Sequence, residues 1–462
     1  MYRFDLNGFP KKNLVQELIN EFLPPSSYSV TPDGAEEGDR LIPVASADGG
    51  SLDEIKREVF DALKRETGDA PAWGILTGVR PVKLCGELLA RTGSAEEVRR
   101  ILCGPYRLSE NKADLLLRIY GYQQRVCGEA PADSAAVYLG IPFCPTRCLY
   151  CSFASNQVKH PVIEEYLTAL KHEVGAVGAA MRESGWTTES LYFGGGTPTT
   201  LTASELDDLI GTLEKAFDLS ALKEFTVEAG RPDTIDREKL RVLKDHGVGR
   251  ISINPQSMNQ HTLDLIGRSH SPKDIERAFE DALAVGFDSI NADIIAGLPE
   301  EELPDLLATL EKVISLGADN VTVHSLAVKR ASRLIEVDPD YHYKQGKLVQ
   351  RMVAEAADRL AAEGFVPYYL YRQKHMAGAC ENTGYCRDDR AGLYNVRIMD
   401  EHQSVVAMGA GGISKIYFPA ENRLERVPNV TDYRQYIDRI DEMLERKYTG
   451  LFSRRIGKEE TC

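Results

Sequence analysis

The chain has 462 residues, 43% of them apolar, which is enough for two or three domains with a sizeable buried core. Its 55 basic and 70 acidic residues give a formal charge of −15, which argues against nonspecific binding to nucleic acid or to membrane surfaces. No apolar run reaches the roughly 18 residues of a membrane span, and the start lacks the apolar core of a signal peptide. We therefore expect a cytoplasmic protein with no nucleic-acid partner and no membrane insertion.

Residues 1–130 have the pattern of an N-terminal α/β accessory domain. Helices are expected at 13–22, 52–67, 95–102 and 112–126. The second of these has apolar residues at helical spacing, at Ile55, Val59, Phe60 and Leu63. The stretch GEAPADSA that follows has the composition of a linker, and the domain contains no catalytic motif.

Residues 131–330 alternate between short strand-like runs and amphipathic helices. The runs are VYLGIPF, SLYFGG, EFTVEA, GRISIN, DSINADII and NVTVHS, with helices expected at 161–184, 203–217, 235–246, 259–266, 273–285 and 302–316. Parallel strands need crossover helices between them, so six alternations predict a partial (β/α)6 TIM-type barrel. Active-site groups of such barrels gather at the C-terminal ends of the strands.

Residues 331–462 predict a mixed α/β extension that covers the barrel and the substrate site. A long helix is expected at 343–363, a strand at 404–408 and a final helix at 433–448. Between them, the glycine-rich run at 409–412 either allows the backbone to approach a ligand closely or simply forms a turn.

The cysteines point to metal chemistry rather than to disulfides. Nine cysteines is an odd number for a disulfide framework, and six of them are scattered, as inert buried thiols often are. The other three, Cys144, Cys148 and Cys151, form the spacing CxxxCxxC directly after the first barrel strand. Cysteine thiolates hold [4Fe–4S] clusters, and three of them leave one iron open for a small molecule. The alternatives are a chance cluster or a zinc site, which needs a fourth ligand; His160 is nearby but belongs to no paired motif.

The second barrel strand ends in YFGGGTPT. Glycines let the backbone approach a ligand closely, although a glycine-rich turn alone is as often only a turn. Its position one βα unit after the cysteines favours a binding role.

Together these two motifs resemble the radical S-adenosylmethionine superfamily. The resemblance implies a [4Fe–4S] cluster whose open iron is chelated by the methionine end of S-adenosylmethionine, and whose electron generates a 5′-deoxyadenosyl radical. The element from Gly194 to Pro198 resembles the superfamily's GGGTP contact with the methionine end. The cofactor-binding residues that the resemblance implies are Tyr138, Tyr150, Gly195, Gly196, Thr197, Glu228, Gln256, Arg268 and Asp293.

The polar residues of that set have individual roles under the resemblance. Glu228 would accept hydrogen bonds from the cofactor, Gln256 would bind the ribose hydroxyls, and Arg268 would pair with the methionine carboxylate. Asp293 lies within an apolar strand, where a carboxylate needs a partner. A structural salt bridge or a helix cap is the alternative for each residue.

Over roughly residues 70–420 the motifs narrow the resemblance to the oxygen-independent coproporphyrinogen III oxidase family. GVRPVKL, TVEAGRPDT, TVHSLAVKRAS and YYLYRQKHMAG resemble its HemZ-type coproporphyrinogen dehydrogenase branch. The implied reaction is an oxidoreduction in haem biosynthesis without oxygen: two propionates of coproporphyrinogen III become vinyl groups, giving protoporphyrinogen IX. The family also implies a low-potential electron donor such as flavodoxin or ferredoxin, and places Gly196 and Thr197 near a second S-adenosylmethionine molecule.

Two departures from the best-studied branch leave other functions open. Gly140 stands where that branch has histidine, and Ser152 and Phe153 follow Cys151, whereas that branch carries a fourth cysteine just beyond the cluster motif. The family also includes haem chaperones and tetrapyrrole methyltransferases with the same barrel, and a fold does not settle function.

A tetrapyrrole with carboxylates needs aromatic and basic neighbours. The chain offers these residues directly after the sixth strand and in the YYLYRQK stretch: Lys329, Arg330, Tyr371, Arg372 and Lys374. They predict either a clamp for propionates or another tetrapyrrole's carboxylates, or a solvated basic face.

Overall fold

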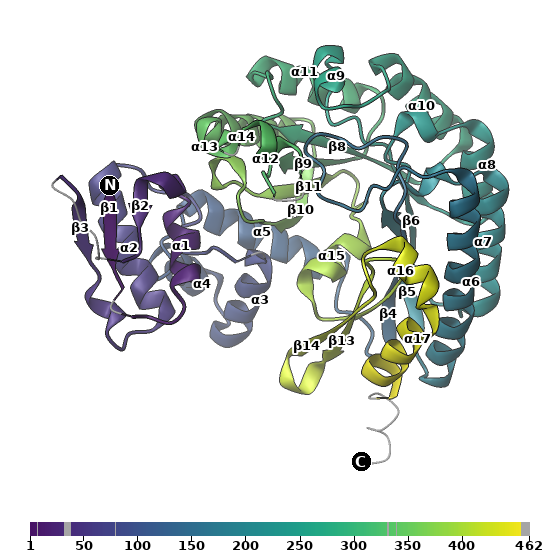
Figure 1. Cartoon of the computed structure of the whole chain (residues 1–462), viewed down its shortest axis with the longest axis horizontal. Helices are drawn as coiled ribbons and strands as arrows, with labels where there is room; N and C mark the ends of the chain where they lie inside the picture. The colour runs from purple at the N-terminus through teal and green to yellow at the C-terminus, as the bar shows by residue number, and fades with distance from the viewer. Residues whose placement is uncertain (7, 32–37, 79, 330–331, 339, 454–462) are drawn as a thin grey trace.

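Six parallel strands form the centre of the fold in the computed structural model, which describes residues 1–453 except 7, 32–37, 79, 330–331 and 339 (Figure 1). The strands pair in chain order, each parallel to the next. They are β4 (Ser134–Ile141), β5 (Thr187–Gly195), β6 (Glu224–Glu228), β7 (Arg250–Ser252), β8 (Ser289–Ala296) and β9 (Asn320–Ser325). The prediction of a partial (β/α)6 barrel is thereby confirmed.

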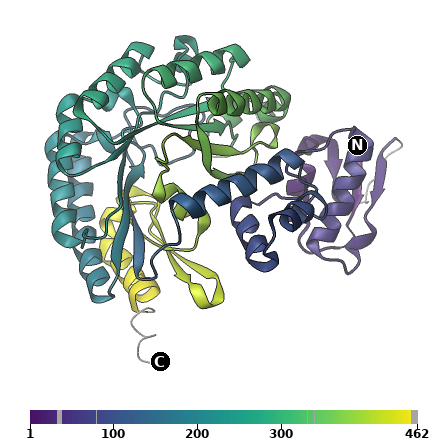
Figure 2. The same cartoon turned by 180° about the vertical axis from the view of Figure 1, so that it is seen from behind.

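Helices follow each strand and cover the outer face of the sheet (Figures 1 and 2). The larger ones are α6 (His160–Glu183), α7 (Ala203–Ala216), α8 (Arg237–Asp245), α10 (Pro272–Val285), α11 (Leu303–Ser315) and α14 (Gly346–Ala362), with the short α9 (Gln260–Leu265) between β7 and α10. Several begin at a capping box; in α7, Thr202 accepts from the Glu205 amide and Glu205 binds the Thr202 amide.

Successive side chains of β4 face alternately the hydrophobic core beneath the outer helices and the interior of the barrel. Val137 and Leu139 pack with the outer helices in the main hydrophobic core, whereas Tyr138, between them, stacks on tyrosines inside the barrel. Successive side chains of a strand point to opposite faces, so each barrel strand contributes one row to the core and one to the interior.

The C-terminal segment extends both edges of the six-stranded sheet, giving the order β10-β11-β9-β8-β7-β6-β5-β4-β12-β13-β14. Antiparallel β10 (Val366–Tyr371) and β11 (Asn382–Cys386) continue from β9. On the other edge, β12 (Ser404–Met408) pairs in parallel with β4, and β13 (Ile413–Phe418) and β14 (Arg423–Pro428) form a hairpin beyond it. The remaining helices are α12 (Leu334–Val337), α13 (Tyr341–Lys344), α15 (Leu393–Asp400), α16 (Tyr433–Asp438) and α17 (Ile440–Lys447).

The glycine-rich run after β12 packs against the first barrel strand. Gly409 has φ +90°, and a Cβ there would lie 2.4 Å from the Gly140 carbonyl oxygen and 2.7 Å from the Tyr166 hydroxyl. Of the two alternatives for this run, the structure shows a turn whose backbone contacts β4.

Residues 1–126 build a separate layer against the β10 edge (Figure 2). Its small parallel sheet has the order β2-β1-β3, and Leu370 of β10 joins the core of its helical part. The elements are β1 (Tyr2–Asp5), α1 (Lys12–Ile19), β2 (Tyr28–Ser29), β3 (Arg40–Pro43), α2 (Leu52–Thr67), α3 (Pro81–Thr92), α4 (Ala95–Cys103) and α5 (Glu110–Val126). None of the described helices has both the length and the apolar content needed to cross a membrane.

Candidate functional site

A cavity of about 410 Å³ opens at the C-terminal ends of the barrel strands. Its wall takes side chains from all six barrel strands and from β10, β11 and α15. Fourteen of the site residues predicted from the sequence line it: Tyr138, Cys144, Cys148, Tyr150, Cys151, Gly195, Gly196, Thr197, Glu228, Gln256, Arg268, Asp293, Lys329 and Tyr371. The structure therefore brings together residues spread over more than half of the chain.

The three cysteines lie on the loop between β4 and α6, which neighbouring backbone holds in place. The Leu149 amide donates to the Ile266 carbonyl at 2.9 Å, at the end of α9. In turn the Leu334 amide, at the start of α12, donates to the Leu149 carbonyl at 3.1 Å. Leu149 makes both hydrogen bonds and lies between Cys148 and Cys151, so these bonds fix the position of the cysteine loop at the end of the barrel.

A buried ion pair pins the same loop from the third strand. Arg231 donates two hydrogen bonds to Asp233, at 2.9 and 2.8 Å, and a third to the Thr146 hydroxyl at 2.7 Å. Burial alone would raise the pKa of Asp233, but the adjacent His270 and the hydrogen bonds from Arg231 hold it well below its usual range. The carboxylate thus stays charged and keeps Arg231 on the loop.

The donor set and the space around it fit a cubane cluster. Gly196 leaves room for Cys144: a Cβ on Gly196 would lie 3.0 Å from the Cys144 Sγ and 2.6 Å from the Phe143 carbonyl oxygen. Burial raises the pKa of the Cys144 thiol to about 11. In the described residues, no three His, Cys, Asp or Glu side chains gather tightly enough for a single metal ion. A cubane instead binds each thiolate through a different iron and spreads the ligands apart.

Glu228 faces the cavity from the end of β6 as a carboxyl group that resists ionisation. Burial raises its pKa to about 7, although the hydrogen bond that the Tyr192 hydroxyl donates to its Oε1 at 2.6 Å works in the opposite direction. A Cβ on Gly194 would come within 3.2 Å of the Glu228 carboxyl, so the glycine loop and this carboxyl lie against each other.

Gln256 and Arg268 bring polar atoms to the cavity that the protein itself does not satisfy. Gln256 has φ +66°, an unusual backbone for a residue other than glycine, and the described residues offer no partner to its buried Oε1. Arg268 donates to the Asn254 carbonyl at 2.5 Å and to the Tyr150 hydroxyl at 3.3 Å, while its Nε has no acceptor in the described chain. Since an unpaired buried polar atom costs free energy, these groups suit a polar ligand such as S-adenosylmethionine.

Three polar side chains from three different strands lie in a row: Asp293, His324 and Tyr371. His324 Nε2 lies 3.6 Å from the Asp293 Oδ2, and its Nδ1 lies 3.4 Å from the Tyr371 hydroxyl. Burial would raise the pKa of Asp293, but the neighbouring His324 and the hydrogen bond that Asn291 donates to its Oδ1 at 2.8 Å lower it. Asp293 therefore loses its proton at lower pH than Glu228 does.

Several lining residues were not found from the sequence. They are mostly polar or tyrosine side chains on the interior rows of the strands or on C-terminal elements: Tyr192, Ser252, Asn254, Asn291, Thr322, His324, Tyr369, Asn382, Asn395 and Met399. Two pairs had a readable signal, because Asn291 with Asp293 and Thr322 with His324 alternate within otherwise apolar strands.

The residues expected to clamp a substrate fall into two groups. Lys329 and Tyr371 line the cavity, and the Lys329 Nζ lies 5.7 Å over the Phe153 ring. Burial lowers the pKa of Lys329. Arg330 lies outside the described residues.

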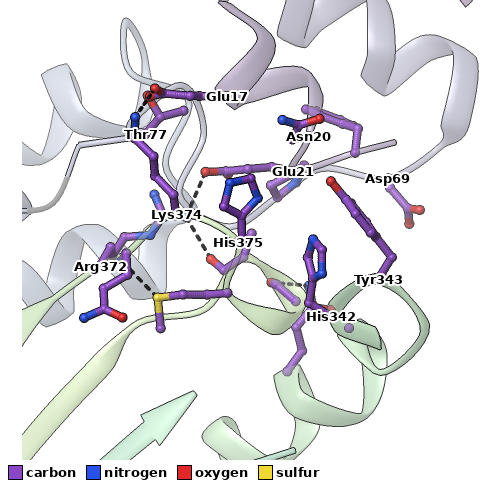
Figure 3. A pocket seen from close by; sticks show the side chains of 18 of the residues that line it. Glu17, Asn20, Glu21, Asp69, Thr77, His342, Tyr343, Arg372, Lys374 and His375 are labelled. Carbon is purple, nitrogen blue, oxygen red and sulfur yellow. Dashed lines mark hydrogen bonds and ion pairs between the residues drawn. The ribbon is translucent and has the colours of Figure 1, made fainter. Parts of the chain in front are cut away.

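Arg372 and Lys374 point away from this cavity, toward the N-terminal domain. They line a second pocket, of about 240 Å³, between α1, α13 and the β10–β11 loop (Figure 3). There Arg372 pairs with Glu21 at 2.9 Å and Lys374 pairs with Glu17. The reason is the strand alternation beyond Tyr371, which turns Arg372 to the opposite side of the sheet. Among the described residues of the expected clamp, Lys329 and Tyr371 therefore lie at the cavity and Arg372 and Lys374 do not.

Comparisons with known proteins agree with this geometry. Residues 138–313 match the family model of the radical SAM superfamily. The oxygen-independent coproporphyrinogen-III oxidase-like protein HemZ of Bacillus subtilis is 35% identical over 393 residues, which cover 84% of this chain and 78% of HemZ. The heme chaperone HemW of the same organism is 35% identical over 195 residues, 42% of this chain and 51% of HemW.

The fold has a solved counterpart. Coproporphyrinogen III oxidase (HemN) from Escherichia coli, a radical SAM enzyme, superimposes with a TM-score of 0.53 at 22% identity, over 70% of this chain and 73% of that chain. The region matched by the family model contains the cysteine loop, the second half of β4 and the barrel strands β5 to β8. The chain therefore belongs to the radical SAM superfamily and, within it, to the family of HemZ and the oxygen-independent coproporphyrinogen III oxidase-like proteins.

Proposed function

We propose that this protein is a radical SAM oxidoreductase that converts two propionate side chains of coproporphyrinogen III into vinyl groups, with loss of two molecules of CO₂. The observation that carries the proposal is the similarity to HemZ over most of both chains. The cavity supports it, because its wall combines three thiols with tyrosines and a lysine. Membership of the superfamily implies a [4Fe–4S] cluster and S-adenosylmethionine.

The side chains divide the work between cofactor and substrate. Cys144, Cys148 and Cys151 hold the cluster, which when bound supplies the electron that cleaves S-adenosylmethionine to a hydrogen-abstracting radical. The S-adenosylmethionine contacts are Tyr138, Tyr150, Gly195, Gly196, Thr197, Glu228, Gln256, Arg268 and Asp293.

The substrate half has its own side chains. Lys329 offers a charge-assisted hydrogen bond to a propionate, and Tyr371 offers a hydroxyl next to it on the cavity wall. A second S-adenosylmethionine molecule next to Gly196 and Thr197, a flavodoxin-like or ferredoxin-like donor, and a terminal electron acceptor complete the proposal.

The decisive experiment gives the anaerobically reconstituted protein S-adenosylmethionine, a low-potential reductant and coproporphyrinogen III. We expect CO₂, 5′-deoxyadenosine and a vinyl product in stoichiometric amounts. Tight haem binding without substrate-dependent cleavage of S-adenosylmethionine would instead assign the chain to the haem chaperones, which the similarity to HemW makes the second candidate. Transfer of a methyl group to the tetrapyrrole would assign it to the methyltransferases.

The cluster assignment has a separate test. Cys148→Ala should abolish the visible absorbance of the reconstituted cluster, because two thiolates do not hold a cubane. Cys103→Ala is the matched control, since Cys103 lies on α4 in the N-terminal domain, and it should leave the spectrum unchanged. An unchanged spectrum in Cys148→Ala contradicts the site.

A further inference from the structure

Four basic side chains converge on one carboxylate between α3 and the C-terminal extension. Glu401, at the end of α15, is 8% exposed. Around it are Arg80 at 3.1 Å, Lys83 at 3.8 Å, Lys415 at 3.3 Å and Arg426 at 3.2 Å. We call this group the Glu401 cluster. Its charge is +3, in a chain whose total charge is −15.

Two of these cations stand where helix electrostatics disfavours them. Arg80 precedes the first residue of α3, and Lys83 lies in its first turn, which contains no acidic residue. The first turn of a helix carries partial positive charge, so it attracts anions and repels cations. Both residues come from the GVRPVKL motif, to which the proposed function gives no role.

The other two cations face each other across a pair of strands. Lys415 of β13 and Arg426 of β14 are direct partners in the hairpin register. Like charges placed directly opposite each other on neighbouring strands are destabilising. The hairpin and α3 lie side by side in both views of the molecule, so the four cations meet between the N-terminal domain and the C-terminal extension (Figures 1 and 2).

Burial increases the cost of this charge excess. The Lys415 side chain is only 9% exposed, and burial together with the Arg80 charge lowers its pKa to about 8. Among the ion pairs of the described residues, Arg80 pairs with Glu401 alone, and its buried Nε finds no acceptor there. One carboxylate therefore leaves both charge and hydrogen-bonding capacity unsatisfied.

We propose that the Glu401 cluster binds a phosphate-type oxyanion, either free or as the phosphoryl group of a small metabolite. Guanidinium groups bind such oxygens through paired hydrogen bonds, and a dianionic phosphate offsets more of the excess charge than a carboxylate does. The ligand would link α3 of the N-terminal domain to the β13–β14 hairpin. This inference stands independently of the proposed reaction, because the cluster lies outside the barrel cavity.

The test measures thermal stability and calorimetric binding of the full-length protein in phosphate-free buffer. The probes are inorganic phosphate, pyrophosphate and ATP, each compared with sodium chloride at equal ionic strength. We expect saturable stabilisation by phosphate compounds beyond that by chloride. Saturation by inorganic phosphate identifies a free oxyanion, whereas a response to ATP alone identifies a phosphorylated metabolite. An equal response to chloride at matched ionic strength overturns the proposal.

Variants locate the site. Arg426→Gln, at a half-exposed position, should weaken phosphate binding at least about tenfold, the effect of losing one charge-assisted contact. Arg423→Gln is the control on the same strand, because Glu421 and Glu425 already balance Arg423, and it should bind as the unaltered protein does. Equal losses in the two variants, or none in either, contradict the assignment.

Glu401→Gln should change the response to phosphate in the opposite direction from Arg426→Gln. The variant therefore distinguishes a ligand site from a structural ion network. Removing the carboxylate that the four cations share should lower the thermal stability without phosphate but increase the stabilisation that phosphate produces, because the anion replaces the lost charge. If Glu401→Gln lowers stability and phosphate does not restore it, the cluster is structural and the proposal is wrong.

Discussion

At the scale of single residues, Gly196 matters because of space rather than backbone freedom. Its φ is not in the left-handed region, yet a Cβ would clash with the Phe143 carbonyl oxygen at 2.6 Å and crowd the Cys144 Sγ at 3.0 Å. Both contacts belong to the loop after β4 that carries the first cysteine. A single methyl group therefore acts directly on the position of a proposed cluster ligand.

Gly196→Ala should displace the cysteine loop and weaken cluster retention several-fold, measured as faster loss of cluster absorbance to an iron chelator. Gly211→Ala is the matched control, because Gly211 lies within α7 with open space around it, and alanine there should be neutral or stabilising by up to about 1 kcal/mol. Similar rates of cluster loss in both variants would contradict this view of Gly196.

Glu228 makes the stability of the protein without ligands depend on pH. Its native pKa of about 7 lies above the unfolded value of 4.5, so the native state holds the proton more tightly. The resulting stabilisation is fully present below pH 4.5 and is lost as pH rises through 7. A shift of this size corresponds to about 3 kcal/mol at most.

Glu228→Gln should remove this dependence. Compared with the unaltered protein, the variant should match its thermal unfolding midpoint near pH 4.5 and exceed it at pH 8, since glutamine cannot ionise. Tyr192→Phe should shift the loss of this stabilisation to higher pH, because the substitution deletes the hydrogen bond that lowers the pKa of Glu228. A constant difference between Glu228→Gln and the unaltered protein at all pH values would contradict the assignment.

At the scale of elements, the end of β10 attaches the N-terminal domain. Arg372 is 3% exposed; it donates to the Ala379 carbonyl at 2.9 Å, pairs with Glu21 of the segment after α1, and its guanidinium lies 5.2 Å from the centre of the Trp73 ring. Trp73 in turn donates to Glu381 at 2.8 Å, next to β11. One strand end thus connects two parts of the N-terminal domain to the barrel edge.

Arg372→Met should loosen this attachment, at a cost of roughly 3–5 kcal/mol, because it leaves the buried Glu21 carboxylate without its cation. We expect faster cleavage by a broad-specificity protease within the exposed linker at 128–133. Lys374→Met is the control from the same stretch: this lysine is 60% exposed, and its ion pair should contribute under about 1 kcal/mol. Equal cleavage of the two variants would show that Arg372 does not hold the domain.

The elements that sequence predicts best are those whose own pattern determines them. The helix at 52–67 has its expected bounds, because Ser51 and Glu54 form a capping box and Gly68 ends it at φ +75°. The helix at 81–92 was not predicted; its Pro81 resembles loop punctuation but stands at the first helical position, where proline is favoured. The expected final helix is divided at Arg439, which has φ −120°, into α16 and α17.

At the scale of the whole molecule, the residues proposed to hold the cofactors were predicted to share one site, whereas the rest of the cavity wall was predicted only in part, through Lys329 and Tyr371. The cysteines, the glycine loop and the polar residues of β6 to β8 follow one another in chain order at strand ends, where parallel strands must bring them together. Asn395 and Met399 reach the cavity on α15, and Tyr369 and Tyr371 reach it on an antiparallel strand. Their positions depend on long-range pairing that no local pattern encodes.

The two-sided pairing of the C-terminal segment has a consequence for how the protein is made. Until β11 and β12 emerge from the ribosome, the edges of β9 and β4 present unpaired backbone groups, which are prone to associate with other chains. Parallel sheets also form slowly, because their contacts are far apart in sequence. The helical core of the N-terminal segment, which includes Leu370, must wait for β10, and the edge of the barrel must wait for residues up to Met408. Nascent chains that stall earlier are therefore natural clients of chaperones and proteases.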